Sequence, residues 1–224
     1  MFKIIATTNE ALDFSIGPAM RHITRLVQKN FKYPHNYKFT TTSKHWQSYG
    51  FGIKSKGKPS ASIKSLMRSE NKFDCERTAL SICLYNILKQ IGDNDFDSKI
   101  KGELRITAQG NFQSVQIALR NMIEVCYLND FSEIVVGDWL YFENSPSYLE
   151  NNRGGYASGE HVICSSVKPL RFIGLLDKSL PLTYEEWLNV LYSNSEGIDF
   201  KDIKGVYKHD GKIVVKRYLN SRPT

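Results

Sequence analysis

The stretch Phe73-Asp74-Cys75-Glu76-Arg77-Thr78-Ala79-Leu80 opens the segment around which the chain is organised. Apolar residues recur at helical spacing from there towards Gly92, which predicts a helix with a wide apolar stripe. Asp74 is a favourable N-cap and Gly92 a favourable stop, so we expect the helix at roughly residues 75–91. Cys75 would then lie on the first helical turn.

A cysteine on the first turn of a buried helix has a particular chemical setting. The unpaired backbone N–H groups and the positive end of the helix dipole favour a thiolate over a thiol there. Several unrelated thiol enzymes present their nucleophile in this way. The pattern makes Cys75 a candidate nucleophile, and the alternative is a small residue on a first turn without a chemical role.

The composition is that of a soluble globular protein, with 224 residues, 41% hydrophobic and 12% aromatic. There is no internal repeat and no convincing linker, so we expect one domain over residues 1–224, in which 1–43 is a less certain N-terminal extension. No apolar run is long enough to cross a membrane. Residues Met1–Glu10 lack the apolar core of a secretory signal. We therefore expect a protein that is cytoplasmic as made, with export by a signal-independent route left open.

The four cysteines are not spaced as a metal site or a disulfide framework. They show no CxxC spacing and no histidine at zinc-finger distance. Cys83 and Cys164 lie in apolar runs and are expected in the core. The acidic stretch Asp93-Asn94-Asp95-Phe96-Asp97 lacks the glycine and terminal glutamate of an EF-hand, so we interpret it as a connecting loop. No cofactor and no metal is expected.

The net charge of +7 arises from 30 basic and 23 acidic residues. Basic side chains gather over residues 54–68 and 201–217, as they would on a nucleic-acid-binding surface. No DNA- or RNA-binding motif accompanies them. An acidic protein partner is therefore a better expectation than nucleic acid, and no membrane partner is expected.

Periodicity and turn residues predict further elements on both sides of the central helix. Helices are expected at Pro18–Gln28, Ser60–Met67, Phe112–Leu128 and, behind a capping box, from Thr183 to about Tyr192. Strands are expected at Ile134–Phe142, Glu160–Val167, Arg171–Leu176, Gly205–Tyr207 and Ile213–Tyr218. Pro169 and Asp210-Gly211 predict two hairpins, between the second and third strands and between the last two.

A thiol acyl-transfer enzyme also needs a base near the sulfur and donors for the oxyanion. The best candidates are Glu160 and His161, on the strand that begins at Gly159. Because side chains alternate along a strand, only one of the two can face Cys75 in a regular strand. His161, with an ordinary pKa of about 6.5, could take the proton directly, whereas Glu160, at about 4.3, would need its pKa raised by burial. Asp74 either tunes the site or simply caps the helix.

Three short motifs follow one another along the chain: Phe73-Asp74-Cys75, Gly137-Asp138-Trp139-Leu140-Tyr141-Phe142-Glu143-Asn144 and Gly159-Glu160-His161-Val162-Ile163. They resemble the bacterial spore-coat type of protein-glutamine gamma-glutamyltransferase. That family has a Phe-Glu-Cys turn, a Gly-Asp-Cys-Leu-Tyr-Phe strand and a Gly-Glu-Asn-Val-Ile segment in the same order. The resemblance covers roughly residues 44–177.

The resemblance implies a papain-like α+β fold, related to cell-wall endopeptidases, in which the helix-borne cysteine packs on an antiparallel sheet. It implies Cys75 as nucleophile and Glu160 as its partner, with Asp74 replacing the acid before the cysteine. Two positions depart from the family: His161 stands where it has Asn, and Ile173 falls at about the place of its histidine on the next strand. The related endopeptidases use a histidine near the start of this strand as base. An imidazole needs no large pKa shift for this work, so we favour His161 over Glu160 as base, with Glu160 orienting it or helping to bind the incoming amine.

We therefore expect a calcium-independent cysteine acyltransferase that acts on protein glutamine through a thioester. Its partners would be a protein with an accessible glutamine and, as acceptor, a lysine amine, giving an isopeptide crosslink, or water, giving deamidation. One alternative is a cysteine endopeptidase or amidase on peptidoglycan peptides, which would favour His161 as base. The other is a non-catalytic domain that binds an acidic partner through its basic surface, against which the intact Cys75 and the two candidate bases argue.

Overall fold

The computed structural model describes residues 18–34, 39–49, 52–100, 102–107, 112–113, 115–116, 119–151, 158–177 and 181–219. The expectation for Met1–Glu10 lies outside the described residues. The helices are α2 (Pro18–Asn30), α3 (Pro59–Arg68), α4 (Cys75–Ile91), α5 (Asp93–Lys99), α6 (Tyr148–Asn151) and α7 (Tyr184–Ser193), with short 3-10 turns η3 (Phe131–Glu133) and η4 (Phe200–Asp202).

The strands are β1 (Phe31–Lys32), β2 (Thr40–Thr41), β3 (Trp46–Tyr49), β4 (Gly52–Ser55), β5 (Asn71–Lys72), β6 (Arg105–Thr107), β7 (Ile123–Leu128), β8 (Trp139–Glu143), β9 (Gly159–Val167), β10 (Leu170–Ile173), β11 (Gly205–Val206), β12 (Lys208–His209) and β13 (Lys212–Tyr218). The main sheet has seven strands in the order β10-β9-β8-β13-β12, with β11 paired to β8 and β7 to β13. All of its pairings are antiparallel. Two three-stranded sheets, β1-β5-β2 and β3-β4-β6, complete the β structure of the described residues.

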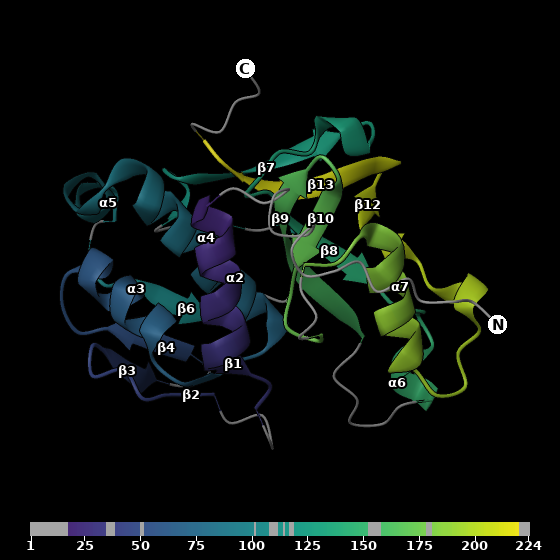
Figure 1. Cartoon of the computed structure of the whole chain (residues 1–224), viewed down its shortest axis with the longest axis horizontal. Coiled ribbons are helices and arrows are strands. Elements are labelled where there is room, and N and C mark those ends of the chain that lie inside the picture. The colour runs from purple at the N-terminus through teal and green to yellow at the C-terminus, as the bar shows by residue number, and fades with distance from the viewer. Residues whose placement is uncertain are drawn as a thin grey trace.

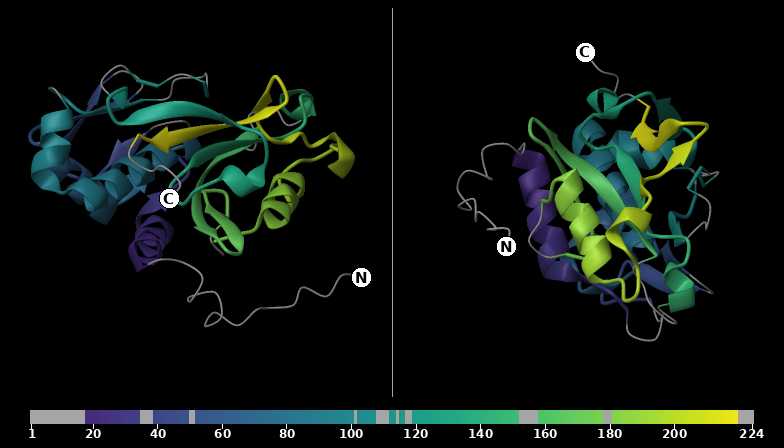
Figure 2. Two further views of the ribbon diagram at one scale, coloured as in Figure 1. Left: turned by 90° about the horizontal axis from the view of Figure 1, so that it is seen from above. Right: turned by 90° about the vertical axis from the view of Figure 1, so that its right-hand side faces the viewer.

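The central helix lies between two parts of the molecule. On one side α4 contacts α2, α3 and α5, and on the other it contacts β9 of the main sheet. Figure 1 shows these helices and the two small sheets on the left, and the main sheet with α7 on the right. In Figure 2, α2 and α7 both lie on the same side of the main sheet. The expected α+β fold, with the helix that bears Cys75 packed on an antiparallel sheet, is confirmed.

The limits of α4 are those expected from its end residues. The Asp74 side chain accepts a hydrogen bond from the N–H of Arg77 at 2.8 Å and so satisfies one first-turn donor. Gly92 ends the helix at a φ of 81°, and its N–H donates to the Leu88 carbonyl at 2.9 Å. Nearly all of the helix from Glu76 to Leu88 is buried, so α4 forms the centre of the core.

The predicted helix from Phe112 to Leu128 is wrong. Its second half, Ile123–Leu128, is strand β7, which pairs with β13 residue by residue from Ile123 opposite Tyr218 to Leu128 opposite Ile213. Ile, Val and Tyr dominate this segment, and these residue types suit a pleated, half-buried surface. The spacing of the apolar residues alone is compatible with a helix or a strand. The pairing with β13 makes the segment a strand.

The predicted loop at Asp93–Asp97 is also wrong, because these residues belong to helix α5. Asp93 and Asp95 lie in its first turn and Lys99 in its last, where their charges complement the helix dipole. Phe96 is fully buried and anchors the helix to the core. The acids that suggested a loop are therefore acids at a helix start.

The other predicted elements are present with shifted ends. The strand expected from Ile134 begins only at Trp139, after a turn in which Gly137 has a φ of 97°. The hairpin of β9 and β10 and that of β12 and β13 are confirmed, the latter with positive φ at Asp210 and Gly211. Thr183 and Glu186 form the expected capping box at the start of α7.

Candidate active site

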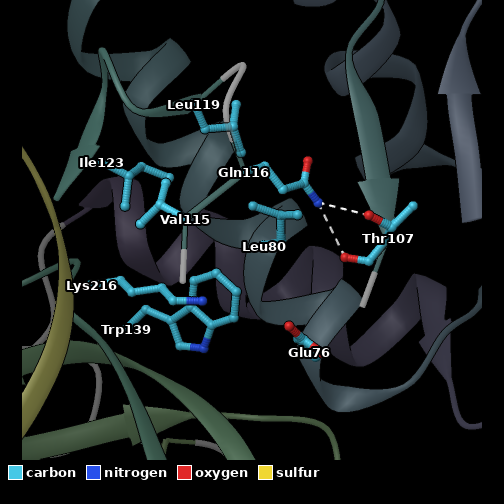
Figure 3. A pocket seen from close by; sticks show the side chains of 9 residues that line it. All are labelled: Glu76, Leu80, Thr107, Val115, Gln116, Leu119, Ile123, Trp139 and Lys216. Atoms are coloured by element: carbon cyan, nitrogen blue, oxygen red, sulfur yellow. Dashed lines mark hydrogen bonds between the residues drawn. The ribbon is translucent and has the colours of Figure 1, made fainter. Parts of the chain in front are cut away.

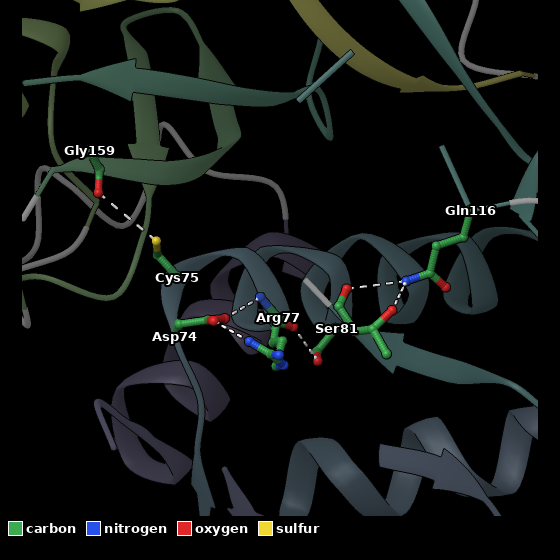
Figure 4. Close-up of polar contacts among 7 residues, drawn as sticks. Asp74, Cys75, Arg77, Ser81, Gln116 and Gly159 are labelled. Carbon is green, nitrogen blue, oxygen red and sulfur yellow. Dashed lines mark hydrogen bonds and ion pairs between the residues drawn. The ribbon is translucent and has the colours of Figure 1, made fainter. Parts of the chain in front are cut away.

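Cys75 is the first residue of α4, and its thiol points towards the start of β9 (Figure 4). The sulfur lies 4.0 Å from the carbonyl oxygen of Gly159, to which the thiol donates. The Cys75 side chain is half-buried, whereas Cys83 and Cys164 are buried as expected; Cys126 is half-buried. All four cysteines are free thiols. Helix α4 and strand β9 therefore place the candidate nucleophile beside the start of the strand that carries both candidate bases.

Glu160 faces the same side of β9 as the thiol and is fully buried. One carboxylate oxygen, Oε2, accepts a hydrogen bond from the Tyr33 hydroxyl at 2.8 Å. The other, Oε1, accepts from the backbone N–H of Leu175 and from that of Leu176, the latter at 3.3 Å. Three donors from two distant parts of the chain thus hold this carboxylate.

Burial raises the pKa of Glu160 to about 7. The hydrogen bonds from Leu175, Tyr33 and Leu176 act in the opposite direction, as does the interaction with the Cys75 thiol, because each favours the ionised carboxylate. The carboxyl group therefore titrates near neutral pH, where a general base is most effective.

The pKa of the Cys75 thiol is raised well above its usual range, first by burial and then by the charges of Glu160 and Asp74. The backbone N–H of His161 and the Tyr33 hydroxyl favour the thiolate but do not offset these effects. The thiolate expected from the position at a helix N-terminus is thus not the resting form. Two neighbouring carboxylates and the surrounding protein keep the proton on sulfur until a base removes it.

The side chain of His161 lies on the opposite face of β9 from that of Glu160. The indole N–H of Trp139 donates to His161 Nδ1 at 3.0 Å, and the Tyr141 ring lies 4.5 Å away between centroids. Burial, and then the charge of Lys216, lowers the pKa of His161 to about 3. With Nδ1 occupied as an acceptor, the neutral ring carries its hydrogen on Nε2 and has no free lone pair for a further proton.

Asp74 lies at the N-terminus of α4 in contact with Arg77. Besides capping the helix, its carboxylate forms an ion pair with the Arg77 guanidinium (Figure 4), which itself lies 3.6 Å from the centroid of the Phe39 ring. Burial raises the pKa of Asp74, and the charge of Arg77 opposes that shift. Asp74 therefore has a clear structural role in addition to its charge near Cys75.

A small cavity is bordered by Trp139 and by Glu76, the residue after Cys75 (Figure 3). Its volume is about 10 Å³, roughly the space of one water molecule. It is lined by Glu76, Leu80, Thr107, Val115, Gln116, Leu119, Ile123, Trp139 and Lys216. Lys216 is buried there with its Nζ 4.1 Å from the Trp139 ring centroid, and burial lowers its pKa to about 8. The cavity is too small for a substrate side chain.

Two residues of the site were not recognised in the sequence. Tyr33 lies in none of the sequence motifs, and its bond to Glu160 spans 127 positions. The Tyr141 hydroxyl lies so close to Gly159 that a Cβ there would be 2.2 Å from it, which explains the glycine. In the sequence Tyr33 and Tyr141 look like ordinary aromatic residues, and only the tertiary structure brings their hydroxyl groups to the site.

Within the described residues, no group of three or more His, Cys, Asp or Glu side chains could hold a metal ion. None of the helices that the structure describes has the length and apolar character that a membrane crossing requires.

A comparison with protein families matches the protein-glutamine gamma-glutamyltransferase family over residues 21–165, well over half of the chain. A comparison with curated proteins finds no match. The matched region includes Tyr33, Cys75, Glu160 and His161, while the backbone donors Leu175 and Leu176 follow it. The chain is a transferase that belongs to the protein-glutamine gamma-glutamyltransferase family.

Proposed function

We propose that Cys75 attacks the side-chain carboxamide of a protein-bound glutamine. The sulfur bonds to the carboxamide carbon, the carbon–nitrogen bond breaks, and the nitrogen leaves as ammonia. The product is a thioester between Cys75 and the glutamyl group. A lysine amine then attacks the thioester to give an isopeptide bond, or water attacks it to give glutamate, and either step restores the thiol.

Glu160 is the base in this proposal. The observation that carries it is a fully buried carboxylate with a pKa of about 7 on the face of β9 that Cys75 approaches. The ionised carboxylate takes the thiol proton as sulfur attacks, and the protonated carboxyl can pass that proton to the leaving ammonia. His161, on the other face, contributes its backbone N–H towards the sulfur rather than its imidazole.

The oxyanion is assigned to backbone N–H groups at the start of α4, including that of Cys75. The Asp74 side chain caps the N–H of Arg77, two residues after Cys75 in the same first turn, and does not occupy the N–H of Cys75. The positive end of the helix dipole lies at the same place and favours negative charge on the carbonyl oxygen. The chemistry needs no Lewis acid, so activity is expected without calcium.

We further propose that the chain falls within the spore-coat type of the family and forms one domain. The order of the Phe73–Cys75, Gly137–Asn144 and Gly159–Ile163 motifs supports the subtype, and a single hydrophobic cluster that runs from Met20 to Tyr218 supports the single domain.

Ammonia release and amine incorporation on a glutamine-rich protein test the proposal. Wild type should release ammonia and incorporate a primary amine, and Cys75→Ala should do neither. Cys126→Ala is the matched control, since Cys126 is also half-buried but lies on β7, and it should behave as wild type. Activity that survives in Cys75→Ala, or its absence in wild type on every glutamine substrate tried, would contradict the proposal.

A further inference from the structure

Tyr33 reaches the active site from a part of the chain remote from β9. It follows β1, which continues directly from α2 and pairs in parallel with β5. Just beyond the paired residues, the N–H of Phe73 donates to the Lys32 carbonyl at 3.0 Å. This pairing places Tyr33 beside the turn that leads into Cys75.

The Tyr33 hydroxyl donates to the Glu160 carboxylate from a side chain, at the oxygen that the backbone N–H groups do not hold. It donates to Oε2 at 2.8 Å, while Oε1 is held by backbone N–H groups that follow β10. Those N–H groups approach closely because Gly174 has no side chain: a Cβ there would be 2.6 Å from Oε1. Ile173, the last residue of β10, falls at about the place of the family's histidine. It is fully buried and apolar, so its side chain offers no hydrogen-bond donor to Glu160.

The two sets of donors hold the carboxylate from opposite ends. Hydrogen bonds at Oε1 alone leave the group free to rotate about its last carbon–carbon bond, whereas a second bond at Oε2 determines which oxygen faces Cys75. A donor also stabilises the ionised form over the neutral one. The hydroxyl of Tyr33 stays protonated as pH rises, because burial and then the charges of Cys75 and Glu160 raise its pKa well above the usual value.

We propose that Tyr33 is a positioning residue for the reaction: its hydroxyl holds the Glu160 carboxylate ionised and oriented towards the Cys75 thiol. The inference rests on the proposed role of Glu160 as base. Tyr33 is then the third residue of the site, after Cys75 and Glu160. It comes from the segment after α2 and not from β10, the strand next to β9.

The test compares Tyr33→Phe with wild type over pH 5–10 (about the range on both sides of the raised pKa of the Glu160 carboxyl). One readout is the alkylation rate of Cys75 by iodoacetamide, followed by peptide mapping, and the other is ammonia release. Tyr33→Phe removes one oxygen and keeps the ring. Tyr85→Phe is the matched control, since Tyr85 is a buried tyrosine on the same helix as Cys75, about 15 Å further along.

In wild type both rates should rise with a midpoint near the pKa of Glu160, about 7, and in Glu160→Gln that rise should disappear. In Tyr33→Phe the midpoint should move up by about one unit, the size expected for one lost hydrogen bond to a charged group. At pH 7 kcat should fall about fivefold with little change in KM, approaching about tenfold at lower pH, and the two rates should become equal at high pH. Tyr85→Phe should match wild type.

An unshifted midpoint in Tyr33→Phe overturns the proposal, whether the rates equal those of wild type or are lower by the same factor at every pH. The second pattern would indicate a structural role only. If wild type releases no ammonia, the proposed function fails, and the alkylation midpoints still decide the role of Tyr33.

Discussion

At the scale of single residues, the site pairs a protonated thiol with a carboxylate that titrates near neutral pH. The pKa of Cys75 is raised and that of Glu160 is about 7, so at neutral pH the sulfur keeps its proton while a large share of Glu160 is ionised. A base whose pKa is close to the working pH combines availability with driving force for proton transfer. In a site with a preformed thiolate the sulfur has already lost its proton. Here the proton moves from Cys75 to Glu160 only as the sulfur attacks.

Glu160→Gln and His161→Asn separate the two candidate bases. Glu160→Gln should lower the acylation rate by at least about a hundredfold, because the carboxamide cannot take a proton. His161→Asn should cost much less, because the imidazole bonds to Trp139 and not to the thiol. Single-turnover acylation kinetics measure both. The reverse order would return the role of base to His161, and a flat response would place the base elsewhere.

The acid limb of the pH–rate profile should report Glu160. Below a pH of about 7 the carboxyl is protonated and cannot act as base, and above it the rate of acylation should level off. His161, with a pKa of about 3, should add no titration between pH 5 and 8. A single-turnover profile checks this. A limb near the ordinary glutamate value of about 4.3 would show that burial does not raise the pKa of the base, and a limb that persists in Glu160→Gln would show that another group titrates.

Both candidate bases could be named from the sequence, but which of them faces the thiol could not. A shift of one residue in the register of β9 on β8 would exchange the faces of Glu160 and His161. The preference for His161 rested on the ordinary pKa of an imidazole. Burial raises the pKa of Glu160 to about 7 and lowers that of His161 to about 3, so Glu160 and not His161 titrates near neutral pH. That preference lacks geometric support in the structure.

At the scale of elements, the start of α4 joins stability to function. Asp74→Ala should lower the free energy of unfolding by about 1–2 kcal/mol through the lost cap. It should cost more through Arg77, which is buried and would lose its anion. Asp74→Asn keeps an acceptor for the cap and loses only the ion pair, so its stability should fall between that of Asp74→Ala and that of wild type. Urea unfolding measures all three, and equal stabilities would refute this role of Asp74.

Elements with strong end signals could be predicted from the sequence, and elements decided by long-range pairing could not. The Asp74 cap, the stop at Gly92 and the capping box at Thr183 are local features, and the helices they delimit were predicted well. The segment at Ile123–Leu128 has apolar residues compatible with a helix or a strand, and β13, which pairs with it, lies far away along the chain.

At the scale of the whole molecule, a buried ion pair fastens the main sheet. Arg217 Nε and Nη2 donate to the two carboxylate oxygens of Asp138 at 2.8 and 2.6 Å, and Nη2 also donates to the Glu133 carbonyl at 2.8 Å. The N–H of Val135 donates to Asp138 as well, at 3.0 Å. The pair joins the C-terminal strand β13 to the turn before β8, so the aspartate of the second motif has a structural role.

Asp138→Ala should therefore lower the free energy of unfolding by about 3–5 kcal/mol, because it leaves a buried guanidinium without an anion. Lys201→Ala, which removes an exposed ion pair with Asp199 and leaves the Asp199 cap of η4 in place, is the control and should leave the unfolding midpoint unchanged. Thermal and urea unfolding measure the effect. Equal stability of Asp138→Ala and wild type would show that the pair does not hold the sheet together.

The central claim is that Cys75 forms a thioester with glutamine after Glu160 removes its proton. The most direct measurement mixes the enzyme with a blocked glutamine peptide, quenches with acid within one turnover, and maps the adduct by mass spectrometry. We expect a mass gain on the fragment that contains Cys75, equal to the mass of the peptide less one ammonia. Hydroxylamine should release the adduct, and Glu160→Gln should form far less of it. No adduct on wild type, an adduct on Cys126 or another residue, or an undiminished adduct in Glu160→Gln would contradict the claim.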